Sequence, residues 1–175
     1  EAAFAVADEW VLKRGKVTGN EHLVAFDADG ELMLAGGGTA TAVAFPSYFS
    51  DLMLGGVVKY ATHNHPRSTG LSNPDLIGML AANLASKKKN TEIDMTISAV
   101  GHGGATSSAT VGPNAWKLLQ DGGYNAAGRG MADIENVSKS YIQQLVSAGD
   151  VSVAAAEIAY PHLVNIALHR LGIID

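Results

Sequence analysis

Hydrophobic and polar positions follow two periods along the first two thirds of the chain, and this pattern predicts interleaved helices and strands. Residues 2–14 repeat their apolar side chains at helical spacing. Further helices are predicted at residues 47–54 and 73–86. Segments with strand character are 22–26, 31–35, 41–45, 57–62, 92–100 and 105–111. Strands alternating with helices favour an α/β sandwich.

Glycine-rich stretches separate these segments. Residues 15–20 are predicted to form a turn after the first helix, and Asp29-Gly30 closes a hairpin between residues 22–26 and 31–35. Gly36-Gly37-Gly38 is expected to break the chain, and residues 101–104 form a further glycine-rich turn.

The pattern becomes helical after Pro113. A short helical piece around Trp116 is expected to lead into a glycine-rich loop at residues 122–130. Two longer helices follow at 131–148 and 151–171, and Pro161 is expected to kink or split the second. We therefore predict a helical extension over about 114–175, which forms either an added layer or a dimerisation element.

Length and composition limit the classes of protein. The 175 residues, 47% of them hydrophobic, suit a single domain over 1–175. The chain holds no cysteine, which excludes disulfides and zinc–thiolate sites. A net charge of -5 argues against a nucleic-acid binder, and no apolar run reaches transmembrane length. Because the chain has neither a signal peptide nor a starting methionine, we expect it to be a piece excised from a longer protein.

The residues with the clearest chemistry are His63-Asn64-His65-Pro66, which follow the apolar strand 57–62. Alternation along a strand points His63 and His65 to the same side, and two imidazoles are half of a metal site. Ser72 has the character of a helix N-cap, and Asp75 lies in the first turn, where the helix dipole favours its ionised form. Asp75 would be the third protein ligand, leaving a fourth position for water. In the alternative interpretation, Ser-x-x-Asp is only a cap and the histidines are loop residues.

These residues resemble the signature of the JAMM (JAB1/MPN+) metalloproteases, His-x-His-Pro followed by Ser-x-x-Asp. The family also has an upstream glutamate, which Glu21 supplies just before the apolar strand His22–Phe26. The His-Asn-His-Pro motif and the strand after Glu21 are most similar to those of bacterial and phage JAB domains, including the RadC-like branch. The spacer between His65 and Ser72 is one residue shorter than in the eukaryotic deubiquitinases and RadC. Its length is more similar to that in the JAB domains of phage head proteins and polymorphic toxins. The resemblance covers only residues 21–75.

The resemblance implies a JAB/MPN-like (deaminase-like) α/β/α sandwich with a mixed sheet and extra C-terminal helices. It implies Zn²⁺ held by His63, His65 and Asp75, with Glu21 as general base and Ser72 as oxyanion donor. The implied reaction is hydrolysis of an amide or isopeptide bond in a protein or peptide. Because Ser72 is also the expected cap, the two roles compete for one hydroxyl.

The same resemblance implies a biological setting. We expect a toxin or effector domain, or a phage-associated protease, that acts in the cytoplasm of its own or a target cell. A toxin would have an immunity protein as partner. Two alternatives stay open: a RadC-like domain that acts on or with nucleic acid, and a non-catalytic MPN-type scaffold.

The other histidines are expected to have lesser roles. His102, on the glycine-rich turn, either lines the active site or, as we expect, lies on the surface. His22 should point to the strand face opposite Glu21. His162 and His169 are two helical turns apart, too far to share one metal ion, and are interpreted as structural or surface residues.

Overall fold

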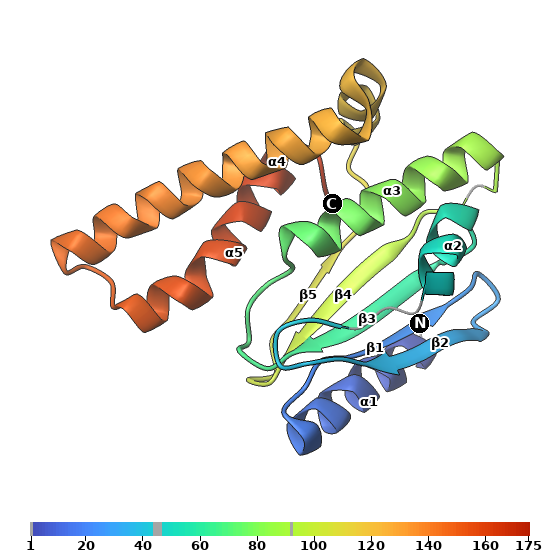
Figure 1. Ribbon diagram of the computed structural model, residues 1–175, viewed down its shortest axis with the longest axis horizontal. Helices are drawn as coiled ribbons and strands as arrows, with labels where there is room; N and C mark the ends of the chain where they lie inside the picture. The colour runs from blue at the N-terminus through green and yellow to red at the C-terminus, as the bar shows by residue number, and fades with distance from the viewer. Residues whose placement is uncertain (1, 44–46, 92) are drawn as a thin grey trace.

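The computed structural model describes residues 2–43, 47–91 and 93–175. A five-stranded sheet in the order β2-β1-β3-β4-β5 forms its centre (Figure 1). The strands are β1 His22–Phe26, β2 Leu32–Gly37, β3 Tyr60–His65, β4 Thr96–Gly101 and β5 Thr106–Ala109. Only the β3–β4 pair is parallel among these strands, so the fold is mixed α/β, as predicted at this coarse level.

Helices cover both faces of the sheet. The helices are α1 Ala2–Thr18, α2 Ser47–Gly55, α3 Asn73–Lys89, α4 Ala115–Ala148 and α5 Val153–Arg170. Helix α1 packs on β1, β3 and β4 from one side, while α3 lies over the other face with α2 beside it (Figure 1). The result is three layers, with the sheet in the middle.

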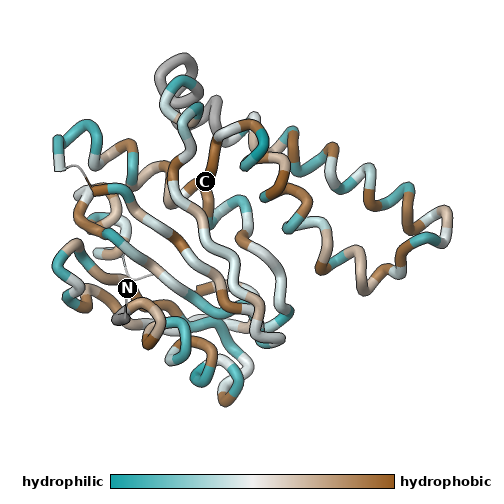
Figure 2. Tube along the Cα trace, turned by 180° about the vertical axis from the view of Figure 1, so that it is seen from behind, coloured by the Kyte–Doolittle hydropathy of each residue, from teal (hydrophilic) through white to brown (hydrophobic). Residues whose placement is uncertain are grey.

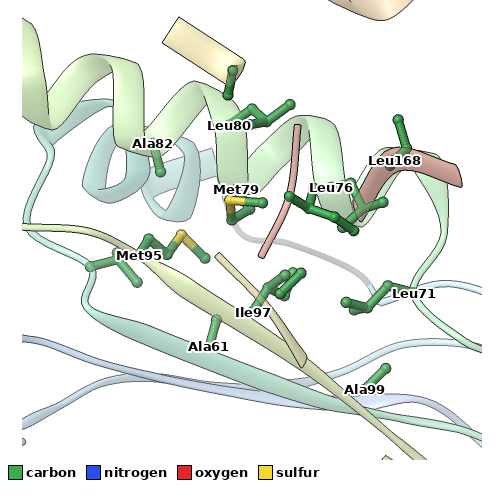
Figure 3. Packing of buried hydrophobic residues seen from close by; sticks show 14 of the residues in the cluster. Ala61, Leu71, Leu76, Met79, Leu80, Ala82, Met95, Ile97, Ala99 and Leu168 are labelled. Atoms are coloured by element: carbon green, nitrogen blue, oxygen red, sulfur yellow. The ribbon is translucent and has the colours of Figure 1, made fainter. Parts of the chain in front are cut away.

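Two hydrophobic cores follow from the alternation along the strands. Leu23 and Ala25 of β1 face the larger core under α3, whereas Val24 packs with Val11 of α1 in the smaller core. Figure 3 shows the larger core, in which α3 lays its apolar side chains over β3 and β4. The labelled residues are Ala61, Leu71, Leu76, Met79, Leu80, Ala82, Met95, Ile97, Ala99 and Leu168.

A buried asparagine fixes α3 relative to the sheet. The Asn83 amide donates to the carbonyl of Met95 at 3.1 Å, and its Oδ1 accepts from the amide N–H of Met95 at 2.8 Å. Because an unmade hydrogen bond of a buried amide costs about 1–3 kcal/mol, this pair holds the helix in one position just before β4 begins. The first turn of α3 is thereby held over the carboxyl end of β3.

The C-terminal residues form a helical hairpin that is joined to the domain. Helix α4 packs on α3, and α5 returns antiparallel to α4 (Figure 1). Both helices carry interspersed hydrophobic and hydrophilic positions (Figure 2). The chain then returns to the sheet beyond β5, where Thr110 and Asp175 exchange two main-chain hydrogen bonds of 2.9 and 3.0 Å.

Several predicted boundaries are wrong. The predicted turn at Gly15 is the interior of α1, which ends only before Gly19, where φ is +73°. Gly36 and Gly37 belong to β2 instead of breaking the chain. Residues 41–43 are not a strand, and the rest of that predicted strand, 44–46, lies outside the described residues, as does Glu92.

The strand that carries the histidines begins at Tyr60 and includes both of them, whereas the sequence placed it at 57–62 with the histidines just beyond. Strand β4 begins at Thr96 instead of residue 92, and β5 spans 106–109 instead of 105–111. Main-chain pairing with neighbouring strands decides these ends, and pairing partners are not visible in a local pattern.

The predicted glycine-rich loop at 122–130 is also wrong, because α4 is one helix over Ala115–Ala148. Each glycine in a helix interior costs about 1 kcal/mol relative to alanine, which weakens a helix without forbidding it. Likewise α5 continues through Pro161 and is not split there. None of the helices in the described part of the chain has the combination of length and apolar character needed to cross a bilayer.

Candidate metal centre and its cleft

Two histidines of β3 project from the sheet toward the first turn of α3. His63 and His65 share the face that carries Ala61, because successive side chains of a strand alternate. Their side chains are 2% and 8% exposed. The two Nε2 atoms lie 2.8 Å apart. The prediction that both imidazoles point to one side is therefore confirmed.

Asp75 reaches the same point from the start of α3. Its Oδ1 lies 3.4 Å from His63 Nε2, and its Oδ2 lies 3.7 Å from His65 Nε2. One ligand atom from each of the three residues falls within 4.8 Å of the others. Zinc–ligand bonds of about 2.0–2.1 Å place tetrahedral ligand atoms about 3.3 Å apart, so the three side chains match the size of such a site.

The cap of α3 sets the position of Asp75. Ser72 is the N-cap, and both its main-chain N–H and its hydroxyl donate to Asp75 Oδ2, at 2.8 and 2.6 Å. The Asp75 N–H in turn donates to Ser72 Oγ at 3.4 Å, which closes a capping box. Oδ2 is thus held by the cap, and Oδ1 faces His63.

The charges of the cluster favour an ionised carboxylate. Burial alone would raise the pKa of Asp75. The charge and hydrogen bond of His63, together with the two hydrogen bonds from Ser72, instead hold that pKa well below its usual range. Burial alone would lower the pKa of His63, yet the carboxylates of Asp75 and Glu21 raise it above its ordinary value. A negative centre that draws a proton onto a buried imidazole is also one that attracts a cation.

His65 is arranged as a neutral ligand. Burial, followed by the charge of His63, lowers the pKa of His65. Its Nδ1 lies 2.9 Å from the carbonyl oxygen of Thr69, which accepts the ring proton. This contact leaves Nε2 with its lone pair directed toward the cluster, the arrangement typical of metal-ligating histidines. His63 differs, because its buried Nδ1 meets no hydrogen-bond partner among the described residues.

Glu21 lies next to the cluster, immediately before β1. The side chain is 9% exposed, and burial raises its pKa to about 7, with opposing effects from His63 and Asp75. The residue is not one of the three whose ligand atoms converge. Its main chain pairs with the segment after β2, through an N–H bond to the Thr39 carbonyl at 2.7 Å and a bond from the Gly38 N–H at 2.9 Å. A carboxyl group that titrates near neutrality has the pKa of an effective general base.

A cavity of about 620 Å³ opens beside these residues. Its lining includes Glu21, His65 and Ser72 together with residues of α5. The wall from α5 is formed by Ala154, Glu157, Ile158, Tyr160, Pro161 and Val164. The C-terminal hairpin therefore bounds the cleft. The sequence predicts this region only as an added layer or a dimerisation element.

The loop between the two halves of the cluster also packs on α5. A Cβ at Gly70 would lie 2.8 Å from Nδ1 of His162, so a residue larger than glycine would not fit there without movement. His162 thus supports the loop and is not among the converging ligand residues, as predicted, and His169 is exposed near the C-terminus. His102 lies on the opposite side of the sheet, within 3.0 Å of the Asn64 amide.

His22 also points away from the cluster, as predicted. Its ring packs edge-on against Trp10 of α1, and its Nε2 lies 2.8 Å from the Thr18 hydroxyl. The sequence interpretation missed Thr69, which contacts His65, and the residues of α5 in the cleft. Neither has a local signal, because Thr69 contacts His65 through its carbonyl and hydroxyl without belonging to a motif, and α5 joins the cleft only through the tertiary fold.

The described geometry thus brings together all five residues singled out in the sequence: three at the point of convergence and two at the rim of one cleft. Comparison with known proteins adds no assignment: no family model matches the chain, and no curated protein or solved structure matches it significantly.

Proposed function

We propose that the protein is a zinc-dependent hydrolase of the JAB/MPN type that cleaves amide or isopeptide bonds in a protein or peptide. The observation that carries the proposal is the convergence of His63, His65 and Asp75 within 4.8 Å, with the buried carboxyl group of Glu21 lining the same cavity. Two imidazoles and one carboxylate are a ligand set typical of catalytic zinc, which keeps an open position.

The three ligand residues fit a zinc ion in chemistry and in spacing. Zinc bound there would supply Lewis acidity, which polarises the scissile carbonyl and makes water a competent nucleophile near neutral pH. His63 and Ser72 lower the pKa of Asp75 and so favour its ionised form, and burial with the charge of His63 lowers the pKa of His65 and favours its neutral form. The hydrogen bond to Thr69 places the ring proton on Nδ1 and leaves Nε2 free. These are the forms in which the two side chains bind metal.

Glu21 has the pKa of a proton carrier. With a pKa of about 7, its carboxylate accepts a proton from the attacking water and then gives it to the departing amine nitrogen. Burial keeps the protonated form accessible at neutral pH, so one residue serves as base and then as acid.

Ser72 is the proposed oxyanion donor, and this role requires its hydroxyl to leave the hydrogen bond that it makes to Asp75. The hydroxyl proton points to Asp75 Oδ2 at 2.6 Å. To stabilise an oxyanion, the hydroxyl must turn from this acceptor toward the cleft, while the Ser72 N–H keeps its own bond to Asp75 at 2.8 Å. Asp75 therefore stays anchored by the main chain when the hydroxyl turns.

The cleft favours a peptide over a nucleic acid. Its lining includes the carboxylates of Glu21, Glu135 and Glu157 and the single arginine Arg67. A phosphate backbone would meet repulsion there, since nucleic-acid affinity depends on neutralising phosphates with lysine and arginine. Apolar side chains such as Ile158 and Val164 give the part of the lining that comes from α5 the character of a peptide groove.

Cleavage of a peptide library tests the proposal directly. Zinc-loaded protein is incubated with a proteome-derived peptide pool and with lysine-branched isopeptides, and new termini are identified by mass spectrometry. The matched control is Glu21→Gln, which keeps the size of the side chain. Cleavage by wild type alone supports the proposal, whereas a folded, zinc-loaded wild type that cuts neither kind of bond contradicts it and favours a scaffold.

A further inference from the structure

Asn64 lies between the two histidines of β3 but faces the other side of the sheet. Its side chain is fully buried. Its Oδ1 accepts a hydrogen bond from the His22 N–H at 2.7 Å, and its Nδ2 donates to the Asn20 carbonyl at 3.0 Å. One amide group therefore binds the main chain on both sides of Glu21.

These two bonds extend the contact between β1 and β3 past the end of their ladder. The antiparallel pairing of the two strands ends at Leu23 and His63. Beyond that pair, the side chain of Asn64 is the partner of the His22 N–H. Glu21, immediately before β1, and the histidines on β3 are thereby connected through a single residue.

The surroundings hold Asn64 in this orientation. Gly15 of α1 lies against its amide, and a Cβ at Gly15 would overlap that amide and lie 2.8 Å from His102 Nε2. The Nδ2 of Asn64 also lies 3.0 Å from His102 Nε2. The glycine inside α1 thus has a steric reason, because only a residue without a side chain leaves room for Asn64.

We propose that Asn64 is a positioning residue that sets where the Glu21 carboxyl group lies relative to His63, His65 and Asp75. The inference rests on the proposed function. Asn64 acts through the main chain at Asn20 and His22, and it reaches neither the ligand atoms nor the cleft. Since a shift of about 1 Å in a reacting group reduces a rate by about a hundredfold, its loss should lower kcat while zinc binding persists.

Two substitutions on different elements test this. Asn64→Ala removes both bonds to the Glu21 segment, and Gly15→Ala displaces the Asn64 amide without altering it. Alanine favours a helix interior by about 1 kcal/mol over glycine, which offsets part of the cost of displacing Asn64, and circular dichroism checks that the variant is folded. The control is Thr62→Val, which lies on the same face of β3 and loses a 2.5 Å hydrogen bond to Asp8 on α1, remote from Glu21.

The readouts are zinc content, amide exchange at His22, and kcat and KM on a peptide cleaved by wild type. We expect both test variants to keep one zinc and an unchanged KM, to expose the His22 amide to exchange, and to lose about ten- to a hundredfold in kcat. Thr62→Val should lower the unfolding temperature and leave kcat unchanged.

Unchanged kcat in both variants, loss of zinc from either, or an equal loss of kcat in Thr62→Val would overturn the positioning role. Continued protection of the His22 amide in Asn64→Ala would do the same without any activity measurement. If the wild type itself cleaves no peptide, the proposed function fails. An active wild type with unaffected variants would overturn only the role of Asn64.

Discussion

His63 and His65 bring their Nε2 atoms to 2.8 Å from each other on one face of β3. The carboxylate of Asp75 lies within 3.7 Å of both atoms, and all three groups are largely buried. Water reaches such a cluster poorly, so the interactions among its charges are strong. A divalent cation would replace this close contact with three ligand bonds.

The first prediction is that the chain binds about one zinc per molecule. At free zinc about a thousandfold above the dissociation constant, binding to the folded state alone adds about 4 kcal/mol to the free energy of unfolding. Elemental analysis and thermal unfolding with and without zinc measure this. His65→Ala should lose both effects, whereas His169→Ala, an exposed histidine, should keep them. A well-folded wild type that takes up no zinc would contradict the assignment.

The second prediction separates metal binding from proton transfer. Glu21→Gln should keep the fold and the zinc, because Glu21 is not among the converging ligand residues. It should lose about a hundred- to ten-thousandfold in turnover, since an amide cannot accept the proton. The measurements are zinc content and kcat for the variant and the wild type. If the substitution released the metal, the division between base and ligands would be wrong.

The third prediction concerns the cap of α3. Ser72→Ala removes the hydroxyl that binds Asp75 Oδ2, so it should weaken zinc affinity and lower the free energy of unfolding by about 1 kcal/mol. The control is Ser152→Ala, because Ser152 caps α5 through a 3.2 Å bond from the Ala155 N–H, away from the three ligand residues. Both variants should lose stability, and only Ser72→Ala should bind zinc more weakly in a metal titration. Equal zinc affinities would limit Ser72 to a cap.

The fourth prediction follows from the raised pKa of Glu21, about 7 against an ordinary value of 4.5. Between these values the unfolded chain has released a proton that the folded chain still holds. The contribution of Glu21 to the free energy of unfolding of the metal-free protein should therefore fall as the pH rises from about 4.5 to about 7, and then level off. Asp75 shifts in the opposite direction, so its contribution is lost only when the pH falls below its ordinary pKa of 3.8.

Denaturant unfolding in the presence of a chelator checks this over about pH 5 to 8. Glu21→Gln is the reference, because it removes this titration and leaves both histidines in place. The stability of the wild type relative to Glu21→Gln should decline across the range. A constant difference would mean that the carboxyl group of Glu21 is not buried in solution.

The fifth prediction tests the biological setting implied by the resemblance to toxin and phage JAB domains. Expression inside a susceptible cell should slow growth, and Glu21→Gln or His63→Ala should abolish the effect at matched protein levels. Growth curves after induction are the measurement. Equal growth with all three proteins, when the wild type is folded and zinc-loaded, would favour phage processing or a scaffold over a toxin.

The features that could be predicted from the sequence are those that depend on only a few neighbouring residues. The start of α3 was predicted because Ser72, Pro74 and Asp75 form a cap, and caps are local. The common face of His63 and His65 was predicted because strand alternation depends only on neighbouring residues.

Gly15 shows where local reasoning failed. Its type indicated a turn, yet it lies inside α1, where its missing side chain accommodates Asn64 from a strand 49 positions along the chain. The glycines of α4 show the same ambiguity, since glycine is compatible with both a loop and a helix.

The sequence by itself determined the ligand types, their common strand face and the capped helix that carries Asp75, because each depends on the backbone geometry of one segment. Only the tertiary structure decided that Asp75 reaches the histidines, that Asn64 holds the chain beside Glu21, and that α5 bounds the cleft. Those relationships join residues far apart in the chain. They arise from burial of the two faces of the sheet and from pairing of its strands, to which distant segments contribute together.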